Sequence, residues 1–179
     1  MGGQGDCADA EGRRIMPATL TEESMSELRV PTLALSAEVL CTDGRSFAGR
    51  IFIPVTASHH SGPMRAEEWI NEPLAFFPFL PDAADAPVIL NKEAILTMSV
   101  AAAADPELPD DPKNPFRRVA LECGQRRLEG FVAIDMPADH ARVLDILNRP
   151  EAFLTLRGNG QHHFVQKKRI TRVVETREG

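Results

Sequence analysis

The sequence predicts a mainly β protein with short helices (α+β), arranged as two tandem five-stranded small barrels, each with one helix between strands 2 and 3. Two observations support this prediction. One phrase occurs twice, as INEPLAFFPFL at 70–80 and as LNRPEAFLTLR at 147–157. Around both copies, apolar and β-branched residues alternate with polar ones over short segments, as is typical of half-buried strands. A chain of 179 residues has room for two such units.

The repeated phrase belongs to a longer match of sixteen columns, 65–80 against 142–157. Five columns are identical, among them Asn71 with Asn148 and Phe76 with Phe153, whereas unrelated segments would share about one. The segments before and after the phrase also match in order and spacing. The sequence therefore predicts an internal duplication, with barrel-like repeats at 31–100 and 116–176.

Each repeat is expected to begin with two strands joined by a tight turn. In the first repeat the turn is CTDGR, whose Asp-Gly is a strong hairpin signal. In the second repeat the turn is CGQR. The strands are expected at 32–40 and 46–55, and at 116–123 and 127–136.

A short helix is expected next in both repeats. Both helices end at Asn-x-Pro, because proline disfavours helical geometry in the residue before it and asparagine tolerates the left-handed C-cap conformation. The first is expected at 64–71, with Trp69 and Ile70 facing inward. The second is expected at 139–148, with Asp139 as the N-cap and Val143, Leu144 and Leu147 on the inward face.

Three more short strands are expected to complete each repeat. The third strand follows the proline, at 75–80 and at 152–157. The segments 88–100 and 163–175 each resemble two strands bent around a polar turn. Outside the repeats, we expect a flexible tail at 1–18, a short capped helix at 19–30 and a linker rich in proline and acidic residues at 101–115.

The repeats resemble the small SH3-like and Sm-like barrels. Gly49 and Gly130 occupy the place of the glycine that lets the second strand of such barrels bend, and LNKEAIL and VQKKRIT resemble the turn between the last two strands. The chain departs from the Sm pattern because Asp145 and Asn148 are three residues apart, where the family has Asp-x-x-x-Asn, and because the final turn lacks Arg-Gly. The unit also resembles a bacterial domain family of unknown function with the pattern LN…FL.L…NK..I.

Composition and targeting signals indicate a soluble cytoplasmic protein. The three cysteines are odd in number and lack CxxC spacing, as expected of free thiols in a reducing compartment. The first residues lack the apolar core of a secretory signal. The most apolar run, at 94–104, is too short to span a membrane.

Catalytic and metal-binding patterns are absent from the sequence, so we expect neither an enzyme nor a cofactor. The motifs of serine hydrolases, P-loop proteins, zinc proteases and dinucleotide-binding folds do not occur, and tyrosine is absent. The pairs His59-His60 and His162-His163 are expected in surface loops at non-equivalent positions. We expect Cys41 and Cys123 to be buried as small apolar groups.

Charge is unevenly distributed and indicates a partner-binding surface. Residues 1–114 carry 8 Lys/Arg and 18 Asp/Glu (net −10), whereas residues 115–179 carry 12 and 8 (net +4). Such halves attract each other within a chain, or between chains head to tail. Trp69, the single tryptophan, is either a core residue or an anchor for a partner. The candidate partner-binding residues are Arg117, Arg118, Arg126, Arg127, Lys167, Lys168, Arg169, Arg172 and Trp69.

These observations favour a non-catalytic adaptor that binds another protein, with an acidic partner surface facing the basic second repeat. An Sm-like nucleic-acid binder is the alternative, opposed by the acidic first repeat and by Phe131, Phe153 and Phe164, which are expected in the core and so could not stack on bases. A small-ligand sensor with a polar pocket between the barrels is a third hypothesis.

Overall fold

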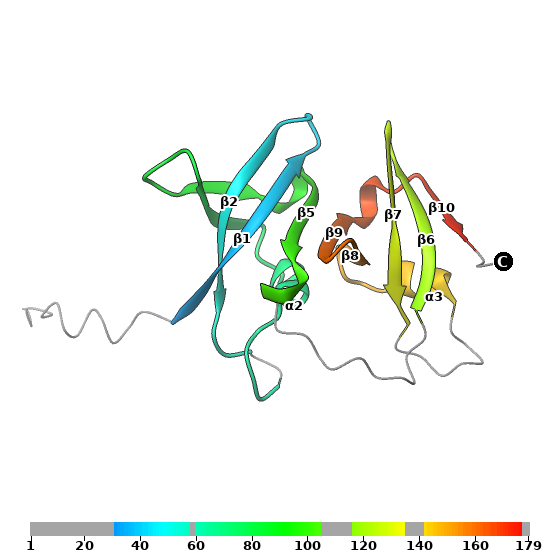
Figure 1. The fold of residues 1–179 in the computed structure, drawn as a ribbon, viewed down its shortest axis with the longest axis horizontal. Coiled ribbons are helices and arrows are strands. Elements are labelled where there is room, and N and C mark those ends of the chain that lie inside the picture. Colours follow the sequence, from blue (N-terminus) through cyan, green and yellow to red (C-terminus); the bar gives the residue numbers. More distant parts are fainter. Residues whose placement is uncertain (1–30, 58–59, 105–115, 135–141, 177–179) are drawn as a thin grey trace, which may run out of the picture. The chain divides into compact units, whose positions relative to one another are not determined.

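The computed structural model describes residues 31–57, 60–104, 116–134 and 142–176, which carry ten strands, two α-helices and three 3₁₀ turns (Figure 1). The first half, residues 31–104, contains β1 (Thr32–Cys41), β2 (Ser46–Pro54), α2 (Ala66–Asn71), β3 (Phe76–Pro81), β4 (Val88–Asn91), η1 (Lys92–Ala94), β5 (Ile95–Ala101) and η2 (Ala102–Ala104). The second half, residues 116–176, contains β6 (Phe116–Cys123), β7 (Arg126–Ala133), α3 (Val143–Leu147), β8 (Phe153–Gly158), β9 (Gln161–Gln166), η4 (Lys167–Arg169) and β10 (Arg172–Glu175).

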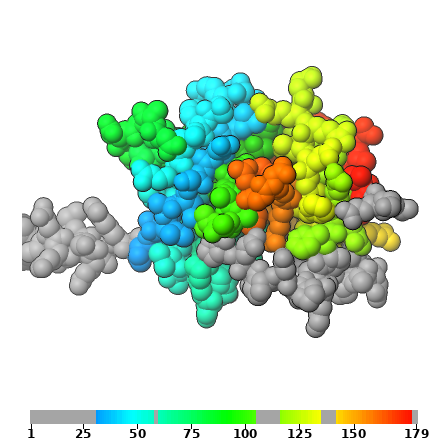
Figure 2. Space-filling model, viewed as in Figure 1, coloured from blue at the N-terminus to red at the C-terminus, as the bar shows by residue number. Residues whose placement is uncertain are grey.

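All ten strands belong to one antiparallel sheet, so the prediction of two separate five-stranded barrels is wrong. The order is β10-β6-β7-β8-β9-β5-β1-β2-β3-β4. The halves join where β5 pairs with β9, over five residue pairs from Thr97↔Val165 to Ala101↔Gln161. In Figure 2 the orange surface of β8–β9 abuts the green surface of β5. This pairing satisfies backbone N–H and C=O groups of β5 and β9 that would otherwise stay unpaired at the edges of two open sheets.

Within this sheet the two halves have the same strand order. Counted within its own half, each runs fifth-first-second-third-fourth, as β5-β1-β2-β3-β4 and as β10-β6-β7-β8-β9. The fourth strand of the second half therefore meets the fifth strand of the first half. We call this β9–β5 pairing the internal joint. The strands lie within a few residues of the segments that the alternation predicts, and the duplication itself stays a prediction.

Two hydrophobic clusters form the core, and they do not divide at the boundary between the halves. The first-half cluster contains residues of β1, β2, α2, β3 and β5, together with Phe153 and Phe164 from β8 and β9. Leu154, Leu156 and Val165 from the same hairpin belong to the second-half cluster. The β8–β9 hairpin is thus buried on both faces, and one face completes the core of the other half.

The two α-helices are shorter than expected. In α2, Trp69 and Ile70 are buried as predicted, and the Glu68 side chain accepts hydrogen bonds from the backbone N–H and the guanidinium of Arg65. In α3 the buried residues are Val143 and Ile146, whereas Leu144 is 61% exposed. The predicted inward face is right for Val143 and wrong for Leu144, while Leu147 is partly buried against the core, because residues three and four apart lie on one face of a helix.

Several predicted segments lie outside the described residues. These are the tail at 1–18, the helix at 19–30, Asp139 and most of the linker at 101–115, of which only the last residue of β5 and the turn η2 are described. No helix within the described ranges is long and apolar enough to cross a membrane.

Candidate functional site

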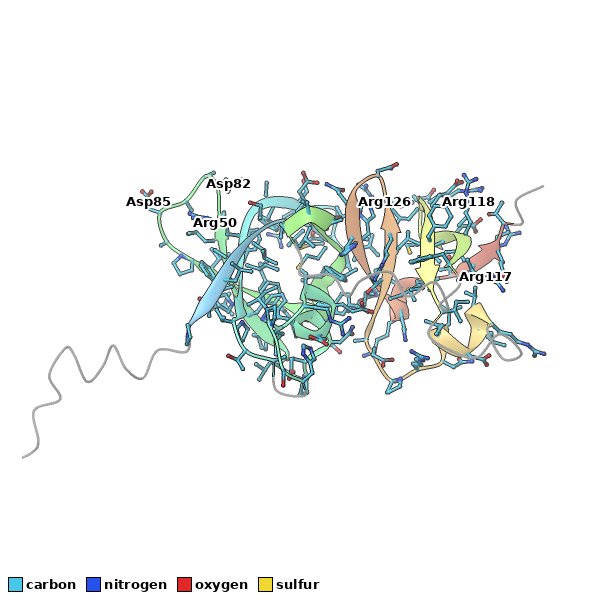
Figure 3. All side chains as sticks on the ribbon, turned by 60° about the horizontal axis from the view of Figure 1, so that its bottom comes forward. Arg50, Asp82, Asp85, Arg117, Arg118 and Arg126 are labelled. Atoms are coloured by element: carbon cyan, nitrogen blue, oxygen red, sulfur yellow. The ribbon has the colours of Figure 1, made fainter. Side chains whose placement is uncertain are left out.

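Most of the predicted basic residues lie on the surface of the second half beside carboxylates. Figure 3 shows Arg117 and Arg118 on β6 and Arg126 at the start of β7. Exposed pairs of this kind contribute about 0–1 kcal/mol each, but they compensate the positive charge locally, so this surface is mixed in charge. The pairs are Arg117–Glu175 (3.4 Å), Arg118–Glu129 (3.6 Å), Arg127–Glu129 (2.9 Å), Lys168–Glu93 (3.1 Å) and Arg172–Glu122 (3.4 Å). Arg169 donates to the Gln166 side chain at 3.1 Å.

Lys167 instead points inward and closes the end of a helix. Its Nζ donates to the carbonyl oxygens of Ile146 (3.0 Å) and Arg149 (3.2 Å), at the C-terminal end of α3. Lys92 makes the matching contacts in the first half, to the carbonyl oxygens of Trp69 (3.1 Å) and Glu72 (2.9 Å). Both lysines supply donors to carbonyls that a helix end leaves unsatisfied, which is a structural role.

Trp69 is a core residue. It is 9% exposed, its ring meets that of Phe77 edge to face with centroids 5.0 Å apart, and Lys92 Nζ lies 5.5 Å from its ring centroid. Burial lowers the pKa of Lys92 from 10.5 to about 8, a shift that the nearby Glu72 carboxylate partly opposes.

The lowered pKa of Lys92 predicts that the free energy of unfolding depends on pH. In the unfolded chain the lysine keeps its proton up to about its ordinary pKa of 10.5, whereas in the folded chain it loses the proton near 8. Between these values the unfolded chain holds more protons, so raising the pH favours the folded state. The unfolding free energy of the wild type, relative to Lys92→Met, is expected to rise by about 1 kcal/mol per pH unit between pH ~8 and ~10.

The measurement is urea unfolding at several pH values. Lys168→Met is the matched control, since that side chain is exposed and contacts a carboxylate rather than helix carbonyls. At pH 7, Lys92→Met should still cost roughly 1–3 kcal/mol, because it leaves two partly buried carbonyls without a donor. A wild-type-minus-variant difference that stays flat from pH ~8 to ~10 would contradict the expectation.

The sequence analysis missed an exposed apolar surface on the β3–β4 hairpin. Paired residues of an antiparallel ladder share a face, so Phe76, Pro78 and Ile89 lie together, with Pro78 opposite Ile89. We call this set the outer face of β3–β4. Phe76 is 57% and Ile89 67% exposed, whereas Phe77 and Phe79 on the inner face are in the core.

A signal for this surface is present in the sequence. Residues 75–80, AFFPFL, are apolar at every position rather than at alternate ones. Continuous apolar strands are typically covered on both faces. The related strand, with Phe153 and Leu154 adjacent and both buried, has both faces covered.

A small pocket adjoins the outer face. It has a volume of about 210 Å³ and is lined by Pro54, Met64, Trp69, Glu72, Leu74, Phe76, Phe77 and Lys92. Pockets for small ligands usually measure roughly 300–1,000 Å³. The Lys92 ammonium is already hydrogen-bonded to helix carbonyls. The pocket lies within the first half, unlike the polar cavity between barrels expected of a ligand sensor.

Two histidines differ from the prediction that they lie in surface loops, whereas His60 lies exposed in a loop as predicted. His162 and His163 are both in β9, where His162 is 4% exposed and His163 Nδ1 lies 2.7 Å from Ser99 Oγ across the internal joint. Burial, with a smaller contribution from His162, lowers the pKa of His163, partly opposed by Glu38. His60 contacts Glu68 at 2.9 Å. His59 lies outside the described residues.

The prediction that Cys41 and Cys123 are buried is confirmed. Cys41 and Cys123 are free and buried, and burial is the main cause that raises the pKa of both thiols. Such thiols are poor nucleophiles. No group of three or more metal-ligating side chains occurs in the part of the chain that the structure describes.

The described surface therefore combines an exposed apolar hairpin at one end of the strand order with charge-compensated basic residues in the second half. Comparisons with protein-family models, with curated proteins and with solved structures found no match to this chain.

Proposed function

We propose that the chain is a non-catalytic protein-interaction module whose contact surface is the outer face of β3–β4. One observation carries the proposal: Phe76 and Ile89, two large apolar side chains on one face of an edge hairpin, are 57% and 67% exposed. Among the described strands, β4 pairs with β3 alone. An exposed apolar face beside an open strand edge favours protein binding by strand addition.

The chain itself contains a buried example of such a surface. The β8–β9 hairpin places Phe153 and Phe164 on the face that corresponds to Phe76 and Ile89, and these rings are 3% and 0% exposed in the core of the first half. A face of this kind thus packs well against protein. The basic second half supports a contact less directly, since most of its predicted basic residues already have carboxylate partners.

The test is site-specific photo-crosslinking in the full chain, in its own cells, with a photoreactive phenylalanine analogue in place of Ile89. Leu144, 61% exposed on α3, is the control position because it is equally apolar and lies outside the outer face. We expect a protein adduct from position 89, lost when Phe76→Lys is added and unchanged by nuclease treatment, and no adduct from position 144.

Other outcomes would overturn the proposal. If no adduct forms at position 89, or if position 144 gives the same adducts, the outer face is not a contact surface. If the adducts depend on intact nucleic acid, the nucleic-acid binder predicted as the alternative becomes the better hypothesis. In that case retention on immobilised RNA should fall steeply with added salt.

A further inference from the structure

We infer that the outer face of β3–β4 binds a second copy of the same chain, head to tail, with β4 of one copy pairing with β10 of the next. This inference rests on the proposed function and names its partner. Within the described residues, β4 and β10 are the two ends of the strand order and each pairs with one strand only.

The internal joint provides the template for this contact. There, the fourth strand of one half (β9) pairs with the fifth strand of the other (β5). The strands left at the two ends are again a fourth strand, β4, and a fifth strand, β10. A second copy can therefore repeat the same kind of pairing with the same strand types.

The apolar side chains that the β3–β4 hairpin would insert into the next copy are exposed. Phe153 pairs with Gln166 on β9 as Phe76 pairs with Asn91 on β4, so the two phenylalanines hold equivalent positions. By the same register, Phe164 corresponds to Ile89. Phe153 and Phe164 are 3% and 0% exposed in the first-half core, whereas Phe76 and Ile89 are 57% and 67% exposed.

The receiving core of the second half is correspondingly open. Three second-half positions are only partly buried although their first-half counterparts are fully covered, whereas Leu156, which matches Phe79, is as buried as its counterpart. This is the difference expected if the second half lacks the hairpin that covers the first. The matched pairs are Ile70 (1% exposed) with Leu147, Ile95 (0%) with Ile170, and Met98 (0%) with Val173.

An asparagine makes hydrogen bonds across the internal joint, and the equivalent asparagine of the second half is available for the same bonds. Asn71 Nδ2 donates to the Phe153 carbonyl oxygen (3.3 Å), and Asn71 Oδ1 accepts from the Phe153 N–H (2.8 Å). Asn148 holds the same place at the end of α3, is exposed, and makes no side-chain hydrogen bond among the described residues. In the assembly Asn148 would make these two bonds to Phe76 of the next copy.

One pair of opposite charges at the internal joint is available again at the two ends. Lys168 and Glu93 hold equivalent positions in η4 and η1 and already pair at the internal joint, and the contact between copies brings a lysine to a glutamate again. Asp82 and Asp85 lie on the exposed loop before β4 (Figure 3), while Arg117 and Arg118 lie on β6, the strand beside β10. Arg117 and Arg118 already pair with Glu175 and Glu129, so the charge argument for a head-to-tail orientation rests on the lysine–glutamate contact.

The template fixes the expected register. Met98↔Phe164 and Ser99↔His163 at the internal joint correspond to Val173↔Ile89 and Val174↔Val88 between copies. Pairing would stop at Pro87, which has no N–H to donate. Because each copy carries both surfaces, the contact is heterologous and the assembly continues beyond two copies.

The test is the mass distribution of the purified full chain by analytical ultracentrifugation over a wide concentration range. The wild type is expected to form species larger than a dimer as concentration rises. Ile89→Lys removes the donated face and Val173→Lys the receiving face, so each variant alone should be monomeric. Mixed in equal amounts, they should form a dimer and nothing larger, because each retains the surface that the other lacks.

Two further variants separate loss of assembly from loss of folding. Phe131→Lys changes an exposed side chain on β7 that faces away from the core cluster, and it should assemble as the wild type does. Asn148→Ala changes an exposed side chain and should raise the dissociation constant by roughly tenfold, the value expected for two lost hydrogen bonds.

A wild type that is monomeric at every concentration overturns the inference. A mixture of the two lysine variants that stays monomeric, while both are folded by circular dichroism, overturns it as well. The proposed function fails separately: an adduct from position 89 to a different protein supports a protein-binding face but contradicts self-assembly.

Discussion

Replacing Phe164 with alanine is expected to lower the free energy of unfolding by about 3–5 kcal/mol, the usual cost of truncating a buried aromatic ring. Phe164 is 0% exposed and lies on β9, in the second half of the sequence, but its ring belongs to the core cluster of the first half. The substitution in the second half should therefore also destabilise the first half, across the internal joint.

Hydrogen exchange with urea unfolding provides the measurement. In Phe164→Ala, amides of first-half strands such as β1 and β5 should lose protection together with those of β8 and β9. Phe131→Ala is the control, since this phenylalanine is 38% exposed on β7 and should cost less than about 1 kcal/mol. If first-half protection stayed at its wild-type level, Phe164 would not couple the two halves.

Gly49→Ala is the second change with a large expected effect, a loss of about 3 kcal/mol or more. A Cβ at this position would lie 2.2 Å from the Leu80 carbonyl oxygen and 2.8 Å from Phe79 Cζ. A backbone oxygen cannot rotate away as the end of a side chain can, so β2 and β3 would have to separate. Gly130 meets the Arg157 carbonyl oxygen at 2.6 Å in the matching place.

Gly158→Ala supplies the matched control for this glycine. Its added Cβ would lie 3.6 Å from the nearest atom, which is an ordinary contact, and the change should be close to neutral. Thermal unfolding followed by circular dichroism compares the three proteins. A Gly49→Ala variant as stable as the wild type would show that β2 and β3 are not held together as closely as the distances indicate.

The sequence pattern could have predicted the exposed apolar face of β3–β4. The clusters of basic residues were a weaker guide to where a contact surface lies. Six consecutive apolar residues at 75–80 already signal a strand covered on both faces. Clusters of arginine and lysine carry no such information, because the carboxylates that compensate them come from neighbouring strands, as Glu129 on β7 does for Arg118 on β6.

The positions of the strands and short helices could be predicted from short sequence patterns. The alternation of apolar residues, the Asp-Gly turn and the Asn-x-Pro stops depend on neighbours within a few residues, and they placed the strands, the short helices and the buried Trp69 and Ile70. Two errors of the same reasoning concern side chains, Leu144 and Phe131, which are exposed where burial was expected. Their burial depends on which surface lies opposite.

The partner of each strand edge was decided by tertiary structure alone. Every edge offers the same backbone N–H and C=O groups, so the residues of β5 do not say whether β5 closes its own half or pairs with β9. Shape and apolar burial decide: Phe153 and Phe164 fill the first-half core only when β9 lies beside β5. The sequence by itself determined the elements and their order, and long-range packing joined them into a single sheet.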